Sequence, residues 1–215
     1  MITALEALNR LREGNHRFVS NDRGGTARTD QARRSELMAG QEPFAIVLGC
    51  SDSRVPIEII LDQGLGDLFV IRVAGNIATP TQVASIEYAA THFHSPLIVV
   101  LGHTMCGAIL AFLDEFKLPD EDRSPEKNSI FESIRPSVEP LLAPELGYTQ
   151  DALVQHAVRA NISASVRHLR NGSQILREQI QREELLVVGA EYSLETGVVE
   201  FFADPQEVEK SGSLN

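Results

Sequence analysis

Two stretches of this sequence decide the fold: residues 44–54, FAIVLGCSDSR, and residues 97–107, LIVVLGHTMCG. Each begins with consecutive apolar residues and then passes through a glycine into a polar cluster. A strand with one face in water alternates apolar and polar residues, whereas a parallel strand covered on both faces is apolar throughout. The runs Phe44–Leu48 and Leu97–Leu101 are therefore predicted to be buried parallel strands.

The rest of the chain alternates similar runs with helical patterns. Two more buried strands are predicted at Leu68–Val73 and Leu185–Val188, and Val198–Phe202 should pair as an antiparallel strand at an edge. Apolar residues recur at helical spacing in an N-terminal arm, residues 1–40, and over 56–63, 80–93, 106–118 and 150–182. This alternation predicts an α/β fold: a mostly parallel central β-sheet flanked by helices, with an N-terminal helical arm and an antiparallel edge strand.

Size and composition limit the classes of protein that fit. We expect the 215 residues to form a single domain, 1–215, in which the proline-containing segment 119–149 is a surface excursion. A net charge of −11 disfavours nucleic acid and anionic membranes as partners. With only 2 cysteines, no apolar run near the ~20 residues of a membrane span, and no signal-peptide pattern, a cytoplasmic protein is predicted.

The polar clusters after the two central strands hold both cysteines, Cys50 and Cys106, together with His103. In open α/β sheets, ligands bind beyond the carboxyl ends of the strands, so these side chains can converge if the strands are neighbours. Two thiolates and one imidazole suit Zn²⁺ and leave its fourth position open, as in catalytic zinc sites. Asp52 and Arg54 follow Cys50 closely, and Arg54 could hold Asp52 through a charge-assisted pair.

Each of these features also has a simpler interpretation. Buried cysteines are more often small hydrophobic side chains than metal ligands. The pattern His103-x-x-Cys106 is short, Asp-x-Arg is common in solvated turns, and Cys50 and Cys106 could form a disulfide, which a reducing cytoplasm disfavours. The metal site is favoured because all of the features coincide at the ends of two strands.

With these motifs, the chain from about residue 4 to residue 202 resembles the β-class carbonic anhydrases. The resemblance rests on Cys50-Ser-Asp52-Ser-Arg54 and His103-x-x-Cys106-Gly107, with supporting stretches at 11–18, 62–69, 72–76, 85–88 and 188–192. It implies one Zn²⁺ per chain held by Cys50, His103 and Cys106, and a catalytic pair formed by Asp52 and Arg54. It also implies that Asp52 can become the fourth zinc ligand in an inactive state. Gln41 and Gly107 would contribute to substrate binding, Gln41 across the interface of a homodimer or a dimer of dimers.

The implied reaction is the reversible hydration of carbon dioxide to bicarbonate and a proton, in which the Asp52–Arg54 pair orients a zinc-bound hydroxide. Two other functions stay open at this point: a hydrolase of carbonyl sulfide or carbon disulfide on the same zinc site, and a non-catalytic zinc-containing scaffold. The hydrolase would differ in pocket shape and access, which motifs do not determine. The scaffold would have no need of an open zinc position.

Overall fold

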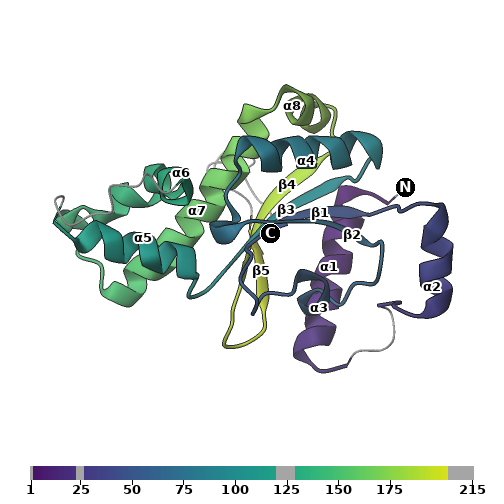
Figure 1. Ribbon diagram of the computed structural model, residues 1–215, viewed down its shortest axis with the longest axis horizontal. Coiled ribbons are helices and arrows are strands. Elements are labelled where there is room, and N and C mark those ends of the chain that lie inside the picture. Colours follow the sequence, from purple (N-terminus) through teal and green to yellow (C-terminus); the bar gives the residue numbers. More distant parts are fainter. Residues whose placement is uncertain (1, 23–26, 120–128, 203–215) are drawn as a thin grey trace.

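The computed structural model describes residues 2–22, 27–119 and 129–202, and its centre is a five-stranded sheet in the order β2-β1-β3-β4-β5 (Figure 1). Strands β2, β1, β3 and β4 run parallel, and β5 pairs antiparallel with β4. The predicted mostly parallel sheet with an antiparallel edge strand is confirmed. The strands are β1 (Ala45–Gly49), β2 (Leu68–Arg72), β3 (Leu97–His103), β4 (Leu186–Tyr192) and β5 (Val199–Phe202).

Helices cover both faces of this sheet, which explains why β1 and residues 97–101 of β3 carry no polar side chain. In β3, Ile98 and Val100 pack into the core on one face, while Val99 and Leu101 pack into the core on the other. The first face carries α4 (Pro80–His92), α5 (Gly107–Lys117), α6 (Ser129–Val138), α7 (Gln150–Gly172) and α8 (Gln174–Gln181). The second face carries α1 (Ala4–Val19) and α3 (Ile57–Ile60), while α2 (Gln31–Glu36) has no buried residue.

The pairing of β1 with β3 places the two polar clusters side by side. Gly49 lies opposite Leu101 in the parallel register, so Cys50 leaves the sheet beside Gly102 and His103. A short 3-10 turn, η2 (Ala74–Asn76), follows β2 and lies against both β1 and β3. The carboxyl edge of the sheet is therefore where three segments distant in sequence meet.

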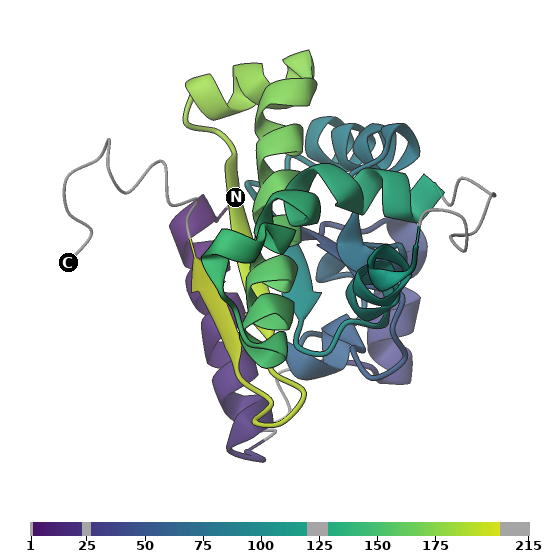
Figure 2. The same cartoon turned by 90° about the vertical axis from the view of Figure 1, so that its left-hand side faces the viewer.

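The N-terminal helix α1 packs on the second face of the sheet and is fixed to the β4–β5 hairpin. Thr3 and Glu6 form a capping box at its start, in which each satisfies a backbone N–H at the helix end. Figure 2 shows α1 running alongside β5. The buried side chain of Asn15 donates to the carbonyl oxygen of Gly197 (2.9 Å) and accepts from the N–H of Val199 (2.8 Å). These bonds join the helix to the β4–β5 hairpin.

Two helices differ from the sequence-based expectation. The helix predicted over 150–182 is interrupted at Ser173, whose backbone is extended and whose hydroxyl accepts from the N–H of Leu176 to begin α8. Of the helix predicted over 56–63, only α3 forms, because the chain turns at Asp62 with a left-handed φ of 46°.

The predicted surface excursion, 119–149, is in part a packed element. Its charged stretch 120–128 lies outside the described residues. The segment that follows forms α6, and Ile134 and Val138 of this helix are fully buried in the core beside α5 and α7. The short turns η3 (Glu139–Leu142) and η4 (Pro144–Leu146) then lead to α7. Across the described ranges, no helix combines the length and apolar character needed to cross a membrane.

Candidate metal centre

Three donor side chains meet at the carboxyl edge of the sheet. Cys50 directly follows β1, His103 ends β3, and Cys106 immediately precedes α5. The Sγ atoms of the two cysteines are 4.0 Å apart, and the three donor atoms all lie within 4.8 Å of one another. All three side chains are buried. They converge as the strand positions predicted, and they form the one group in the described part of the chain that could hold a metal ion.

His103 offers one ring nitrogen to this cluster. Its Nδ1 lies 2.9 Å from the carbonyl oxygen of Thr104, so Nδ1 carries the proton and donates it. Its Nε2 is buried and has no hydrogen-bond partner among the described residues. A buried polar atom without a partner is costly, and the unprotonated nitrogen of a neutral imidazole is a common metal ligand. The donor set therefore fits a metal ion.

The cysteines are free thiols, and their 4.0 Å separation is about twice the ~2.05 Å length of a disulfide. The hydrogen bond with Cys106 lowers the pKa of Cys50, and the N–H of Gly75, 3.4 Å from the Cys50 sulfur, acts in the same direction. The same thiol–thiol bond and burial raise the pKa of Cys106. One thiolate thus opposes the ionisation of the other, and a divalent cation between them would remove that opposition.

Asp52 and Arg54 form an ion pair at the border of the cluster. The backbone N–H, Nε and Nη2 of Arg54 donate to the Asp52 carboxylate at 2.9, 3.0 and 2.7 Å. The side-chain hydrogen bonds from Arg54 hold the pKa of Asp52 far below its usual range, so this carboxylate stays ionised. Asp52 Oδ2 lies 3.8 Å from His103 Nε2. Arg54 therefore holds the negatively charged Asp52 carboxylate beside the candidate metal ligands.

Arg72, at the end of β2, fixes the loop that carries Cys50 and Asp52. Its Nε donates to the carbonyl oxygen of Cys50 (3.0 Å), and its Nη2 donates to the carbonyl oxygen of Asp52 (2.6 Å). The sequence places Arg72 in a motif of the family resemblance, but that motif did not predict that Arg72 fixes this loop. The available signal was an arginine at the carboxyl end of a predicted strand, where ligands of an open sheet gather.

The two remaining candidate residues lie at opposite edges of the sheet, since Gly107 begins α5 and Gln41 precedes β1. Gly107 follows Cys106 and is exposed, and a Cβ atom at this position would meet no atom within 4 Å beyond its chain neighbours and its own helix, so open space lies beside it. Gln41 is exposed and precedes β1, at the opposite end of the strand from Cys50. Within one chain, the structure does not bring Gln41 to the cluster.

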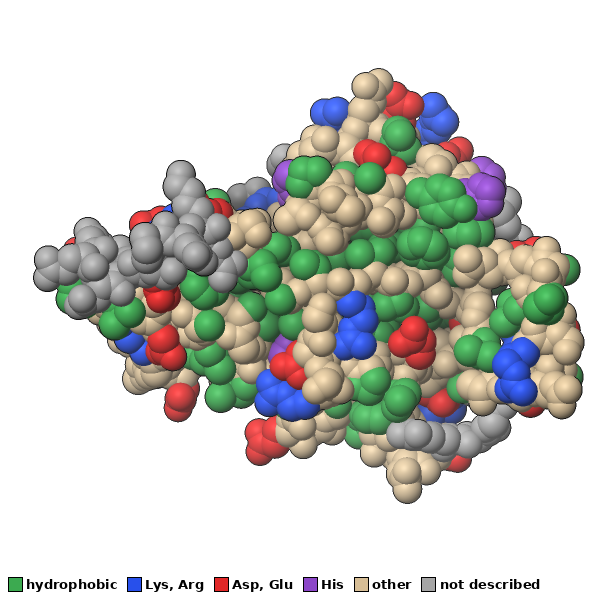
Figure 3. Space-filling view, in the orientation of Figure 1, with side chains coloured by type: hydrophobic (Ala, Val, Ile, Leu, Met, Phe, Trp, Pro, Cys, Tyr) green, Lys and Arg blue, Asp and Glu red, His purple; other side chains and the backbone are tan. Residues whose placement is uncertain are grey.

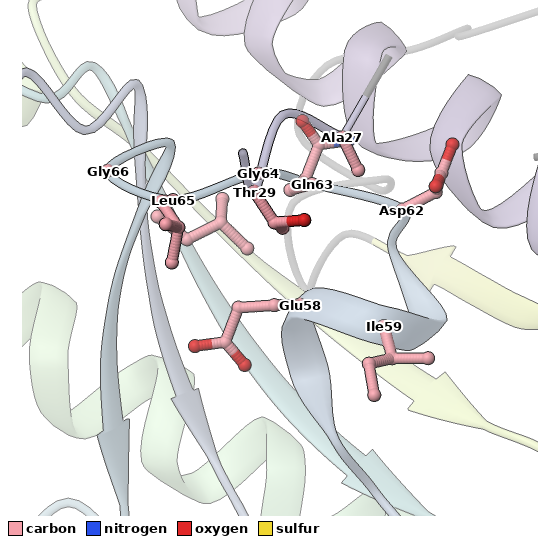
Figure 4. Close-up of a pocket in the computed structure, with 10 residues that line it drawn as sticks. Ala27, Thr29, Glu58, Ile59, Asp62, Gln63, Gly64, Leu65 and Gly66 are labelled. Carbon is pink, nitrogen blue, oxygen red and sulfur yellow. The ribbon is translucent and has the colours of Figure 1, made fainter. Parts of the chain in front are cut away.

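A separate hollow lies beside α3 (Figure 4) and does not carry comparable chemistry. It holds no cysteine or histidine, and one of its two carboxylates, that of Asp62, is engaged by Arg17 at 2.6 Å. Its lining residues are Ala27, Thr29, Glu58, Ile59, Asp62, Gln63, Gly64, Leu65, Gly66 and Leu68. We therefore assign the functional site to the Cys50–His103–Cys106 cluster.

Fold and site together define an α/β protein with a Cys–His–Cys cluster that could hold a metal ion, and comparison with known proteins specifies the family. A family model described as carbonic anhydrase matches residues 45–199. Carbonic anhydrase 2 of Mycobacterium tuberculosis is 40% identical over 192 residues, which cover 87% of this chain and 87% of that protein. The chain belongs to the β-class carbonic anhydrases, a family of enzymes.

Solved structures of this class share the fold. The β-carbonic anhydrase CafA of the fungal pathogen Aspergillus fumigatus aligns with a TM-score of 0.71 and 28% identity, covering 83% of this chain and 85% of that one. One of two tetrameric β-carbonic anhydrases from the ascomycete Sordaria macrospora aligns with a TM-score of 0.66 and 28% identity, covering 79% and 85%. The α/β architecture is thus that of the family.

Proposed function

We propose that this protein catalyses the reversible hydration of carbon dioxide to bicarbonate and a proton, with one zinc ion per chain held by Cys50, His103 and Cys106. The observation that carries the proposal is the buried, unpartnered Nε2 of His103 beside two thiols. Two thiolates and one imidazole are a ligand set of catalytic zinc sites, which keep a fourth position open. Both cysteines are free, as a reducing cytoplasm would keep them, and we propose that location.

When bound, the zinc ion supplies the Lewis acidity that brings the ionisation of a water molecule close to neutral pH. The Asp52 carboxylate accepts a hydrogen bond from the attacking oxygen and directs a lone pair of that oxygen towards the carbon of CO₂. As the new C–O bond forms, one C=O electron pair moves onto oxygen, which gives bicarbonate. The proton released on regenerating the nucleophile passes to buffer.

Arg54 controls where Asp52 can act. The three hydrogen bonds from Arg54 keep the carboxylate ionised and turned in one direction, so it is ready to accept. Released from Arg54, the same carboxylate could become the fourth metal ligand, and the enzyme would then be inactive because the position of the nucleophile is taken. The 3.8 Å between Asp52 Oδ2 and His103 Nε2 supports this second role.

We propose that CO₂, a small apolar molecule, binds in the space beside Gly107. The absence of any atom within 4 Å of a Cβ at this position supports that assignment. A larger side chain here would fill the space next to the cluster. Gly107→Val is therefore expected to reduce turnover more than zinc content.

We further propose that two chains form a homodimer, alone or within a dimer of dimers, so that Gln41 of the partner subunit completes each site. The separation of Gln41 from Cys50 along β1 supports this arrangement. Phe69, in the edge strand β2, is only half-buried, and Tyr88 beside it is 53% exposed. Figure 3 shows a band of hydrophobic side chains across this face, below α4. One structural neighbour is described as tetrameric.

Stopped-flow measurement of CO₂ hydration tests the reaction, with zinc content determined on the same sample. We expect one zinc per chain and rapid turnover. Asp52→Asn should keep zinc and lose about 100-fold or more in turnover, since a positioned acceptor contributes 10²–10⁴-fold. Asp114→Asn, which changes a 74% exposed carboxylate on α5, is the matched control and should behave as wild type.

The alternative outcomes separate the other functions. If the protein holds zinc and turns over carbonyl sulfide but not CO₂, then it is a carbonyl sulfide hydrolase and CO₂ is not its substrate. Zinc without turnover of either compound would indicate a scaffold. Protein kept reduced and away from chelators that contains no zinc would refute the metal centre itself.

A further inference from the structure

The turn η2 brings a backbone group to the candidate metal ligands. The N–H of Gly75 donates to Cys50 Sγ over 3.4 Å. Gly75 (φ 72°) and the next residue, Asn76 (φ 45°), both have left-handed backbone conformations. Two such residues in succession are unfavourable in a free chain and persist where the surroundings hold them. Something in the fold must therefore fix this turn.

Position 75 favours glycine because its φ is positive. A Cβ atom there would lie 3.4 Å from Ala108 Cβ and 3.4 Å from Ile134 Cδ1, which is van der Waals contact. The turn thus packs against α5, α6 and the end of β1. Close packing limits its movement but does not aim its N–H at the sulfur, because apolar contacts have no direction.

Two polar side chains of α7 supply that direction. Asn161 Nδ2 donates to the carbonyl oxygen of Gly75 (2.7 Å), and Ser165 Oγ donates to the carbonyl oxygen of Asn76 (3.1 Å). Residues four apart lie on one face of a helix, so both bonds reach the turn together. The two residues are only 2% and 5% exposed, in a stripe that otherwise packs into the core. Buried polar groups are costly unless hydrogen-bonded, and here both bonds go to the turn.

We propose that Asn161 and Ser165 are positioning residues of the metal centre, which fix the 74–76 turn so that Gly75 N–H donates to the Cys50 thiolate. The inference rests on the metal centre of the proposed function. An N–H···S hydrogen bond stabilises the ionised sulfur and orients it before the metal arrives, so less ordering is needed on binding. Asn161 and Ser165 touch no reacting atom and act through Cys50 alone.

Metal binding to the apoprotein tests this role independently of catalysis. The affinity for zinc is measured by competition with a chromophoric chelator. The surroundings of the Cys50 sulfur are monitored by the wavelength of the sulfur-to-metal charge-transfer band in the cobalt(II) derivative. Asn161→Leu preserves volume but removes the donor, and it is expected to weaken zinc binding about 10-fold. The band should move to longer wavelength, because the sulfur lone pairs lose a stabilising donor. Ser165→Ala should shift both quantities in the same direction by less.

Two controls on α7 separate positioning from loss of stability. Val166→Ala removes fully buried apolar volume without changing a polar group, and Ser163→Ala removes a hydroxyl from the other side of the helix. Val166→Ala should lower Tm, and neither control should change the zinc affinity or the cobalt band.

The inference is overturned if folded Asn161→Leu and Ser165→Ala bind zinc within about two-fold of wild type and keep the band in place. It is also overturned if Val166→Ala produces the same changes as Asn161→Leu. A wild-type protein that binds no zinc would instead refute the metal centre, and with it this inference. Zinc binding without CO₂ turnover would refute only the proposed reaction.

Discussion

Gly102 lies where α7 packs against the strand that carries His103. A Cβ atom added at this position would stand 2.5 Å from Cδ1 and 2.6 Å from Cγ1 of Ile162. Both distances are well below the ~3.5–4.0 Å of favourable carbon–carbon contact. Ile162 is completely buried, so its side chain has no free volume to enter. We therefore expect Gly102→Ala to push α7 and β3 apart.

The size of the effect follows from two opposing terms. Overpacking of a core costs about 1–3 kcal/mol, and replacing a strand glycine by alanine gives back roughly 0.5–1 kcal/mol of backbone entropy. Gly102→Ala should thus lower the free energy of unfolding by about 1–2 kcal/mol. For a chain of this size, Tm would fall by roughly 2–8 °C. Zinc affinity should fall as well, because the displaced strand carries His103.

A double-mutant cycle identifies the clash as the cause. Ile162→Ala alone should cost about 2–5 kcal/mol through loss of buried volume. In the double variant Gly102→Ala/Ile162→Ala, the methyl group added at position 102 would enter the space that the Ile162 side chain leaves. The free energy of unfolding that the double variant loses should therefore be at least about 1 kcal/mol smaller than the sum of the two single losses. Urea unfolding of the metal-free proteins gives the free energy of unfolding for wild type, the two single variants and the double variant. Gly107→Ala is the matched control, because its methyl group meets no atom within 4 Å. Additivity within about 0.5 kcal/mol, or a fully stable Gly102→Ala, would refute the argument.

Three further predictions concern the candidate metal centre and the residues beside it. Cys106→Ser replaces a thiolate by a poor zinc ligand, so the purified variant should hold no zinc after dialysis against a chelator; stoichiometric zinc would exclude Cys106 as a ligand. Thr104→Val removes the acceptor of the Leu194 N–H (3.0 Å) and should cost about 1 kcal/mol in denaturant unfolding, whereas Thr104→Ser should not. Asp52 has a pKa below its unfolded value of ~3.9, so its contribution to stability is present above that pH and lost as the pH falls. Metal-free wild type should therefore lose more stability than Asp52→Asn between about pH 5 and pH 3, and equal losses would argue against the Arg54 pair.

The sheet and the convergence of Cys50, His103 and Cys106 could be predicted because their signals are local. Continuous apolar runs in β1 and β3 require cover on both faces, and the polar residues directly after each run must lie at one edge. The strand order and register depend on contacts distant in sequence, which no single run encodes. The break at Ser173 was missed because apolar periodicity continues through it, although Asn171-Gly172-Ser173 has the composition of a turn.

The groups that support the Cys50–His103–Cys106 cluster could not be predicted from the sequence. Gly75 N–H is a backbone group, and its direction depends on a turn held by a helix some 86 residues later in the chain. The one available signal was the presence of Asn161 and Ser165 in the core-facing stripe of α7, where a polar side chain must find a buried partner. That pattern indicates a buried hydrogen bond but not the group that receives it.

The position of Gln41 at the far end of β1 from Cys50 has a genetic consequence. If each site takes Gln41 from the partner subunit, a chain with Gln41→Ala and a chain with Asp52→Asn damage different halves of the site. A mixed dimer of the two then contains one site with both defects and one site with neither. Two variants that are each inactive should therefore complement one another on co-expression and restore about a quarter of the wild-type activity when chains pair at random.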